Sequence, residues 1–225
     1  MSNKPLPDWE LVLSAAARLQ QILPDAVLVG GTASALYAAH GFSADADHVL
    51  TDLRTRFDQV LSDLEAVAGW KTARVQRPVQ FLGSLDGIET GIRQLIRDEP
   101  LETVVLDYQG ILLTVPSHAE MLRIKAVLAL KRNATRDYLD FVALASQITD
   151  DAIGTALERF DELYPQPNGE SALQQLQIQL ANPMPYDLEG VGLDEYKNLA
   201  PQWHDWQIVK RACARLAILI FEQSC

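Results

Sequence analysis

The stretch VLVGGTASALYAAHGFSADADHV, residues 27–49, decides how the rest of the chain is interpreted. A short apolar run ends at Gly30 and Gly31, and the TASALYAAH that follows is typical of a short helix. ADADHVL then returns to an extended pattern. Residues two apart on a strand point to the same side, so Asp45 and Asp47 would project together. Two interpretations are open: a metal–nucleotide site, or an ordinary strand, turn, helix and strand with two surface acids.

The glycine turn and the paired acids each have a physical reason to bind a ligand. A strand-to-helix turn at Gly30 and Gly31 lets backbone N–H groups approach a phosphate where the helix dipole favours an anion, and Thr32 adds a hydroxyl. Neighbouring carboxylates repel unless a cation neutralises them, and Mg²⁺ binds carboxylates together with substrate phosphates. Each feature also has a structural explanation, because tight turns need glycine and edge strands can carry solvated acids.

The composition is that of an acidic globular protein. Of the 225 residues, 48% are hydrophobic, and 19 Lys and Arg against 30 Asp and Glu give a formal net charge of −11. This charge repels nucleic acid at long range, so an RNA contact would need a local basic patch. Cys213 and Cys225 lack metal-ligand spacing, the first residues do not resemble a secretory signal, and LAILIF is too short to span a bilayer. We therefore expect a cytoplasmic protein that contacts no membrane.

A change of pattern along the chain predicts two domains. Residues 1–116 mix helices with extended segments, and hairpin turns are expected at Asp86-Gly87 and at Gln109-Gly110. Residues 117–225 are helical throughout. The predicted fold class is therefore α+β, a mixed sheet with flanking helices followed by an all-helical C-terminal half. Helices are expected at about 8–23, 32–40, 53–67, 118–132, 135–148, 151–163, 170–181 and 203–222.

Gly-Gly, a short helix and Asp-x-Asp on a following strand together resemble the signature of the nucleotidyltransferase superfamily with the polymerase-β-like fold. The resemblance implies that Gly30, Gly31 and Thr32 hold the nucleoside triphosphate (NTP), and that Asp45 and Asp47 bind two Mg²⁺ ions. The ions would activate a hydroxyl and stabilise the leaving pyrophosphate. The expected activity is transfer of a nucleoside monophosphate to a hydroxyl acceptor, which could be an RNA 3′ end, a protein or a small molecule.

The later stretch EMLRIKAVLALKRNATRDYLDFVAL resembles the helical segment of the AbiEii-type nucleotidyltransferases, which include toxin halves of bacterial toxin–antitoxin pairs. The resemblance implies that Lys125 neutralises triphosphate charge, with Arg132 or Arg136 in support. Lys125 and Arg132 are two helical turns apart and would share a face. Asp137 and Asp140 would also share a face and could hold the arginines. Other stretches of the sequence are similar to an uncharacterised bacterial branch of this family. The resemblance also implies an antitoxin as a partner.

The chain departs from the family pattern in three ways. Gly41, which would end the first short helix, stands where relatives carry a basic residue, and His48 stands where an apolar strand residue is usual. A third carboxylate is expected from a neighbouring strand, with Asp86, Glu102 and Asp107 as candidates and Asp107 preferred. Without a third acid, metal binding would be weaker. A second hypothesis is therefore a catalytically weak binding module in a regulatory or toxin–antitoxin pair.

Overall fold

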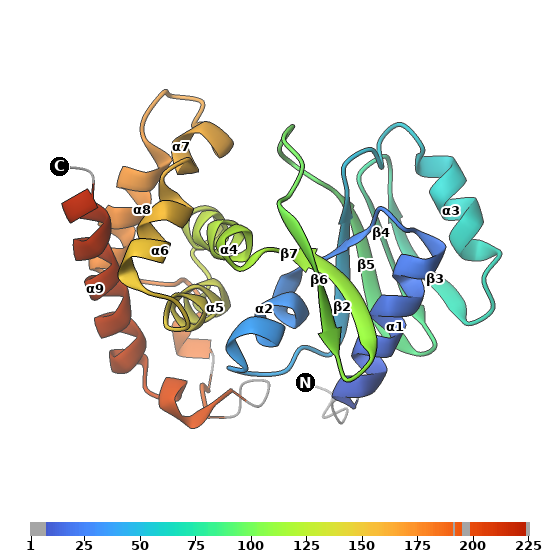
Figure 1. Cartoon of the computed structure of the whole chain (residues 1–225), viewed down its shortest axis with the longest axis horizontal. Helices are drawn as coiled ribbons and strands as arrows, with labels where there is room; N and C mark the ends of the chain where they lie inside the picture. The colour runs from blue at the N-terminus through green and yellow to red at the C-terminus, as the bar shows by residue number, and fades with distance from the viewer. Residues whose placement is uncertain (1–7, 191, 195–198, 224–225) are drawn as a thin grey trace. The chain divides into compact units, whose positions relative to one another are not determined.

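The structure has the mixed α+β architecture that the sequence predicts (Figure 1). It is a computed structural model, and the residues it describes are 8–190, 192–194 and 199–223. A mixed five-stranded sheet with flanking helices forms in the N-terminal half, and helices follow a last hairpin towards the C-terminus. None of the helices in the described ranges is long and apolar enough to cross a membrane.

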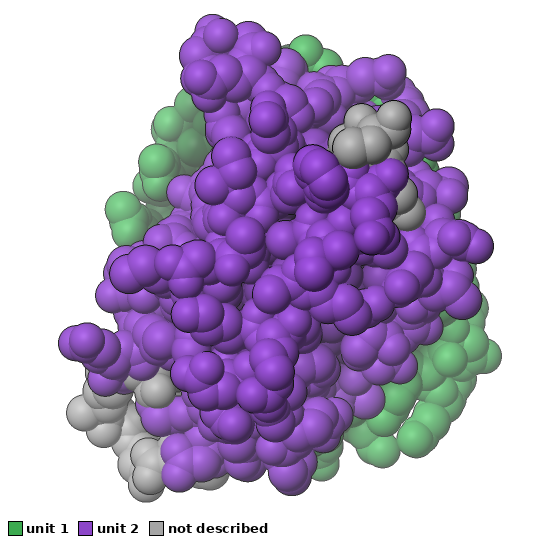
Figure 2. Space-filling view, turned by 90° about the vertical axis from the view of Figure 1, so that its left-hand side faces the viewer, with its two compact units in different colours: residues 1–33, 42–117 green, residues 34–41, 118–225 purple. Residues whose placement is uncertain are grey.

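The chain divides into two compact units, which Figure 2 colours separately. The first unit comprises residues 1–33 and 42–117, and the second comprises residues 34–41 and 118–225. Residues 34–41 group with the second unit by their contacts, although residues on both sides of them in the sequence belong to the first unit. The helix α2 (Gly30–Ala38) therefore begins in the first unit and ends in the second.

The first unit is built on a five-stranded sheet in the order β1-β2-β5-β4-β3. β2 and β5 are parallel, and the other neighbouring pairs are antiparallel. The chain passes from β2 to β5 through α3, β3 and β4, so sequence neighbours alone do not define the pairing. The strands are β1 (Val27–Leu28), β2 (Asp45–Leu50), β3 (Trp70–Gln76), β4 (Gln80–Leu85) and β5 (Ile88–Gln94).

Two helices bury one face of this sheet. They are α1 (Trp9–Ile22) and α3 (Phe57–Glu65). The core cluster joins apolar side chains of both helices to Leu50 on β2 and Phe81 on β4, and the rings of Phe57 and Phe81 lie 4.2 Å apart. Burial alternates along β2, so Asp45 and Asp47 point to the face opposite Leu50. The expectation that both carboxylates project together is therefore confirmed.

A separate two-stranded sheet completes the first unit. It is the hairpin of β6 (Thr103–Tyr108) and β7 (Ile111–Pro116), and β7 contacts α1. The turn residues Gln109 and Gly110 have φ angles of 52° and 88°. The Asp86-Gly87 turn between β4 and β5 has φ angles of 52° and 85°. Positive φ at both central residues is the tight hairpin turn that such pairs favour, so both predicted hairpins are confirmed.

The second unit is helical, as predicted. Besides the last residues of α2, it contains the elements α4 (His118–Arg132), α5 (Thr135–Ala145), α6 (Asp150–Leu157), α7 (Phe160–Leu163), α8 (Ala172–Ala181), η1 (Leu188–Gly190), η2 (Pro201–Trp203) and α9 (Trp206–Gln223). The single helix predicted over 151–163 is wrong, because the structure divides it into α6 and α7.

Two predicted helix ends are also wrong. α2 ends at Ala38 and not near Gly41, and Ala39 takes the left-handed conformation with a φ of 46°. The helix predicted from residue 53 begins at Phe57, because residues 52–55 form a turn. The Asp52 carbonyl accepts the Thr55 N–H, and its carboxylate accepts a hydrogen bond from Arg56 Nε. Local hydrogen bonding by an Asp side chain competes with helix formation in this way.

Candidate functional site

The Gly-Gly turn packs against the acidic strand. α2 begins at Gly30, whose φ of +77° is a backbone conformation that other residues rarely adopt. A Cβ added to Gly30 would lie 3.4 Å from Asp47 Oδ2, and one added to Gly31 would lie 3.1 Å from Ser43 Oγ. The structure therefore brings the predicted glycine turn and Asp47 together.

Two hydroxyl groups hold Asp45 in place. Thr32 is fully buried, and its Oγ1 donates to the backbone carbonyl of Asp45 over 2.6 Å. Ser43 Oγ donates to Asp45 Oδ1. Thr32 therefore connects the start of α2 to β2, and its hydroxyl proton is already used in this hydrogen bond. Ser43, which was not among the predicted site residues, orients the Asp45 carboxylate.

The strand β5 supports Asp47 from the side. Gly91 pairs with Asp47 in the parallel register, and a Cβ added to Gly91 would lie 2.3 Å from Asp47 Oδ1. Arg93 Nη2 lies 3.8 Å from the same oxygen. Glu89 is in register with Asp45, which puts an acid on the neighbouring strand at the same face of the sheet. Neither Gly91 nor Glu89 was predicted as a site residue, although a lone glycine inside a strand signals close approach of another group.

The structure does not bring Asp107 to the acid pair. Asp107 lies on β6, outside the five-stranded sheet, and its carboxylate accepts the Gly110 N–H over 2.7 Å. Of the other two candidates, Asp86 pairs with Arg18, and Glu102 accepts a hydrogen bond from Ser117 Oγ over 3.4 Å. Within the described residues, no group of three or more His, Cys, Asp and Glu side chains is placed to hold a metal ion.

In the second unit, Lys125 belongs to a buried charged cluster. Its Nζ lies 2.6 Å from Asp140 Oδ2, and the side chains of Lys125 and Asp140 are 4% and 14% exposed. His40 Nε2 lies 2.6 Å from the other oxygen, Asp140 Oδ1. Burial acts to raise the pKa of Asp140, but the Lys125 charge and the His40 hydrogen bond outweigh it and lower that pKa to about 2. Asp140 is therefore a carboxylate shared by two partners.

The two predicted arginines lie near the junction of α4 and α5. Arg132 Nη1 is 4.0 Å from Asp137 Oδ1, so Asp137 faces one arginine as expected. Asp137 is buried, and its Oδ2 has no hydrogen-bond partner among the residues that the structure describes. Burial raises the pKa of Asp137, while Lys125, Arg132 and Arg136 act in the opposite direction. Arg136 itself is exposed.

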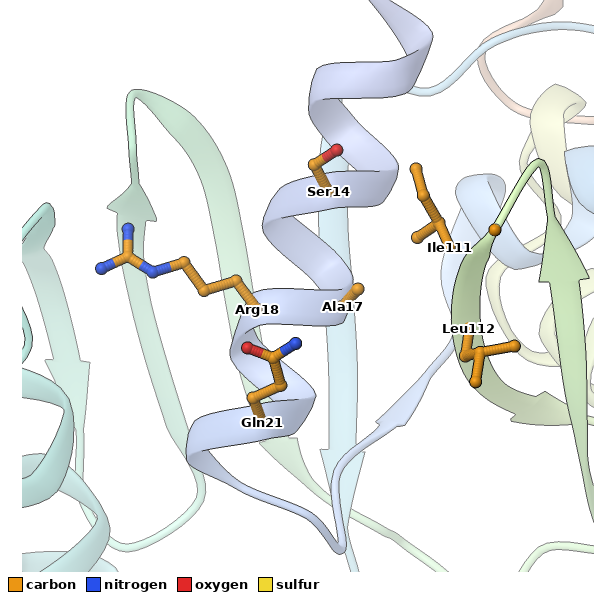
Figure 3. A pocket seen from close by; sticks show the side chains of 7 residues that line it. Ser14, Ala17, Arg18, Gln21, Ile111 and Leu112 are labelled. Atoms are coloured by element: carbon orange, nitrogen blue, oxygen red, sulfur yellow. The ribbon is translucent and has the colours of Figure 1, made fainter.

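A surface hollow of about 450 Å³ lies elsewhere in the first unit, between α1 and the turn of the β6–β7 hairpin (Figure 3). Arg18 and Gln21 of α1 and Leu112 of β7 are among the residues that line it. Arg18 is already paired with Asp86. The hollow contains none of the predicted site residues, so the candidate site is defined by the acid pair and the glycine turn instead.

Sequence comparison leaves the family open. No family model matches the chain. Over 242 residues it is 28% identical to the heme uptake protein MmpL11 of Mycobacterium tuberculosis, covering 98% of this chain and 23% of that protein. Over 220 residues it is 24% identical to the mycolic acid-containing lipids exporter MmpL11 of Mycolicibacterium smegmatis, covering 96% of this chain and 22% of that protein. The chain thus spans less than a quarter of the length of these curated relatives.

Comparison with solved structures establishes the fold. A Helicobacter pylori protein assigned to the nucleotidyltransferases superposes with a TM-score of 0.59 at 18% identity, covering 99% of this chain and 97% of that one. JHP933 from Helicobacter pylori gives 0.55 at 18% identity, with 95% and 93% covered. The antibiotic-resistance factor ANT(2″)-Ia gives 0.50 at 10% identity, with 69% and 92% covered. The chain therefore has a nucleotidyltransferase-like fold.

Proposed function

We propose that the chain is a Mg²⁺-dependent nucleotidyltransferase that transfers a nucleoside monophosphate from an NTP to a hydroxyl acceptor. The observation that carries this proposal is the packing of the Gly30-Gly31 turn against Asp47, on a sheet face where Asp45 and Asp47 project together. The nucleotidyltransferase-like fold supports it. A fold alone does not define an activity, so the proposal depends on these residues.

The residues present fit Mg²⁺. Asp45 and Asp47 supply hard carboxylate oxygens, and Mg²⁺ at phosphoryl-transfer sites commonly takes one or two carboxylates plus phosphate oxygens. The Asp47 carboxylate occupies space that a Cβ at position 91 would fill, so glycine at this position makes room for it. When bound, the metal supplies Lewis-acid polarisation of the phosphate and lowers the pKa of the acceptor hydroxyl.

The protein's own groups would bind the triphosphate and orient the metal-binding carboxylates. Ser43 holds Asp45 in one rotamer through its hydrogen bond, and the Arg93 guanidinium offsets part of the acid pair's charge beside Asp47. The backbone N–H groups at Gly30 and Gly31, at the start of a nine-residue helix, would bind the triphosphate. The assignment of Lys125, Arg132 and Arg136 to the triphosphate rests on the sequence resemblance.

The proposed family branch and biological role rest on the same sequence resemblance. We place the chain with the AbiEii-type enzymes, acting in the cytoplasm as the toxin half of a toxin–antitoxin pair with an RNA 3′ end, a protein or a small molecule as acceptor. Growth arrest on expression, lost in Asp45→Asn/Asp47→Asn and relieved by the product of a neighbouring gene, is the expected result. Full toxicity of that double variant would contradict the assignment.

Calorimetric titration with each NTP, with and without Mg²⁺, tests the site directly. Wild type should bind at least one NTP in a Mg²⁺-dependent manner, and Asp45→Asn/Asp47→Asn should lose that binding. The matched control is Asp25→Asn/Asp58→Asn, which removes the same charge from two exposed acids of the first unit. Absence of NTP binding by folded wild type, or equal loss in the control, refutes the proposed site.

One set of observations favours the second candidate function, a catalytically weak binding module. Within the described residues, no three His, Cys, Asp or Glu side chains are grouped closely enough to hold a metal ion, although Glu89 is in register with Asp45. Lys125 is already paired with Asp140. In this case, the chain forms a stable complex with a neighbouring gene product and releases no pyrophosphate from any NTP. Pyrophosphate release that depends on Asp45 and Asp47 decides against the binding module.

A further inference from the structure

The β6–β7 hairpin leaves one sheet edge open. Antiparallel strands alternate hydrogen-bonded and non-hydrogen-bonded pairs. The Ser117 N–H donates to the Glu102 carbonyl over 2.7 Å just beyond the hairpin, and Val105 lies opposite Thr114 in the register. The pair at Val105 is therefore non-hydrogen-bonded, and its own N–H and C=O point away from β7. The same alternation turns the backbone groups of Thr103 outward.

The opposite edge of the hairpin is closed by a side chain. Gln20 on α1 donates from Nε2 to the Thr114 carbonyl over 2.7 Å and accepts the Thr114 N–H at Oε1 over 2.8 Å. These contacts also confirm the alternation, since the Thr114 groups point away from Val105. For the outward groups of β6, no partner is found within the part of the chain that the structure describes.

The edges of the five-stranded sheet are protected in other ways. β1 is two residues long, and β3 carries Lys71 and Arg74 with a register shift between Thr72 and Arg74. Short strands, charged side chains and irregular register are the devices that prevent edge-to-edge pairing. β6 has a regular register over six residues, and Val105 is 63% exposed. β6 is therefore the unprotected edge.

We propose that β6 pairs with β6 of a second copy of this chain in antiparallel orientation, centred on Val105, so that the two hairpins form one four-stranded sheet. In this register, Val105 faces Val105 of the second copy, and Thr103 faces Asp107. All outward backbone groups of these three residues then find partners. Asp107, the one acidic residue of the strand, lies opposite the Thr103 hydroxyl of the second copy and not opposite the second Asp107. No two like charges therefore face each other in this register.

The chain's overall charge gives this dimer a distinctive salt dependence. Each copy carries a formal net charge of −11, so two copies repel at low ionic strength. Added salt screens this repulsion and leaves backbone hydrogen bonds and apolar contacts nearly unaffected. The dimer should therefore strengthen as salt is added.

Sedimentation equilibrium up to high micromolar concentration tests the proposal. Wild type should approach twice the chain mass of 24.9 kDa. Val105→Pro removes the outward N–H without removing a β6–β7 hydrogen bond, and should weaken dimerisation roughly tenfold or more. Val105→Thr keeps the donor and the β-branched shape and should dimerise like wild type.

A second variant covers the case in which proline disturbs the hairpin. Val105→Lys keeps every backbone group but places like charges opposite each other, so it should also be monomeric. Hydrogen exchange gives an independent readout, because the Val105 amide should become protected as concentration rises. Wild type that stays at 24.9 kDa at every concentration, or a dimer that both variants leave intact, overturns the proposal.

Discussion

Replacing Asp140 with asparagine should strongly destabilise the helical unit. Asp140 accepts from Lys125 Nζ and from His40 Nε2, each over 2.6 Å. The Lys125 side chain is 4% exposed, so Asp140→Asn leaves an ammonium group with its carboxylate partner removed and little water to replace it. The expected cost is therefore that of breaking a buried ion pair from one side.

The size of the effect follows from the structure. Breaking a buried pair by removing one partner costs about 3–5 kcal/mol. Lowering the pKa of Asp140 from 3.8 to about 2 corresponds to about 2 kcal/mol in favour of its ionised form. The second figure is smaller because the burial of Asp140 opposes its ionisation. We expect about 3–5 kcal/mol for Asp140→Asn. Lys125→Met should cost less, about 1–3 kcal/mol, because His40 still donates to Asp140.

Urea unfolding followed by the helical circular dichroism signal measures these costs. The double variant Lys125→Met/Asp140→Asn should cost less than the sum of the single variants, by about 1–3 kcal/mol, because the second substitution removes the charge that the first leaves unpaired. Additive costs, or an Asp140→Asn variant within about 1 kcal/mol of wild type, would refute the reasoning that this pair acts as a unit.

Further predictions concern the acid site and single titrating groups. Gly91→Ala should abolish Mg²⁺-dependent NTP binding, measured by calorimetry, because its Cβ would meet Asp47 Oδ1 and the Asp47 carboxylate would have to move away. The folded state holds the pKa of Asp140 at about 2, so the unfolded chain binds more protons below pH ~4. Stability should therefore fall by about 2 kcal/mol between pH ~4 and ~2, and Asp140→Asn should lack this part of the slope in acid-unfolding curves. Burial raises the pKa of Cys213 to about 12, so in a Cys225→Ser variant a thiol reagent at mildly alkaline pH should react only after denaturation.

Local features of the fold could be predicted from the sequence. Two-residue turns at Asp86-Gly87 and Gln109-Gly110 fix both hairpins, because few residue pairs accept positive φ at both positions. Alternation along ADADHVL puts Asp45 and Asp47 on one face. These signals are local, so a single sequence contains them.

Contacts between distant segments could not be predicted. The parallel pairing of β2 with β5 places Gly91 beside Asp47, although the two residues are 44 positions apart in the sequence. The link between His40 and Asp140 spans 100 residues. Helical spacing suggested that Asp137 and Asp140 hold arginines, whereas Asp140 holds Lys125 and His40. Periodicity indicates which residues share a helix face, but tertiary packing determines which side chains they pair with.

Gln20 closes the β7 edge, and this limits the number of other copies with which one copy can pair. With β6 as the open edge, each copy has one site for strand pairing, and assembly through a twofold axis stops at two copies. β7 also contacts α1 and β1, so the helix that carries Gln20 covers this edge as well as satisfying its backbone groups. The hairpin can therefore add a strand only along β6, and the pairing ends with the second copy.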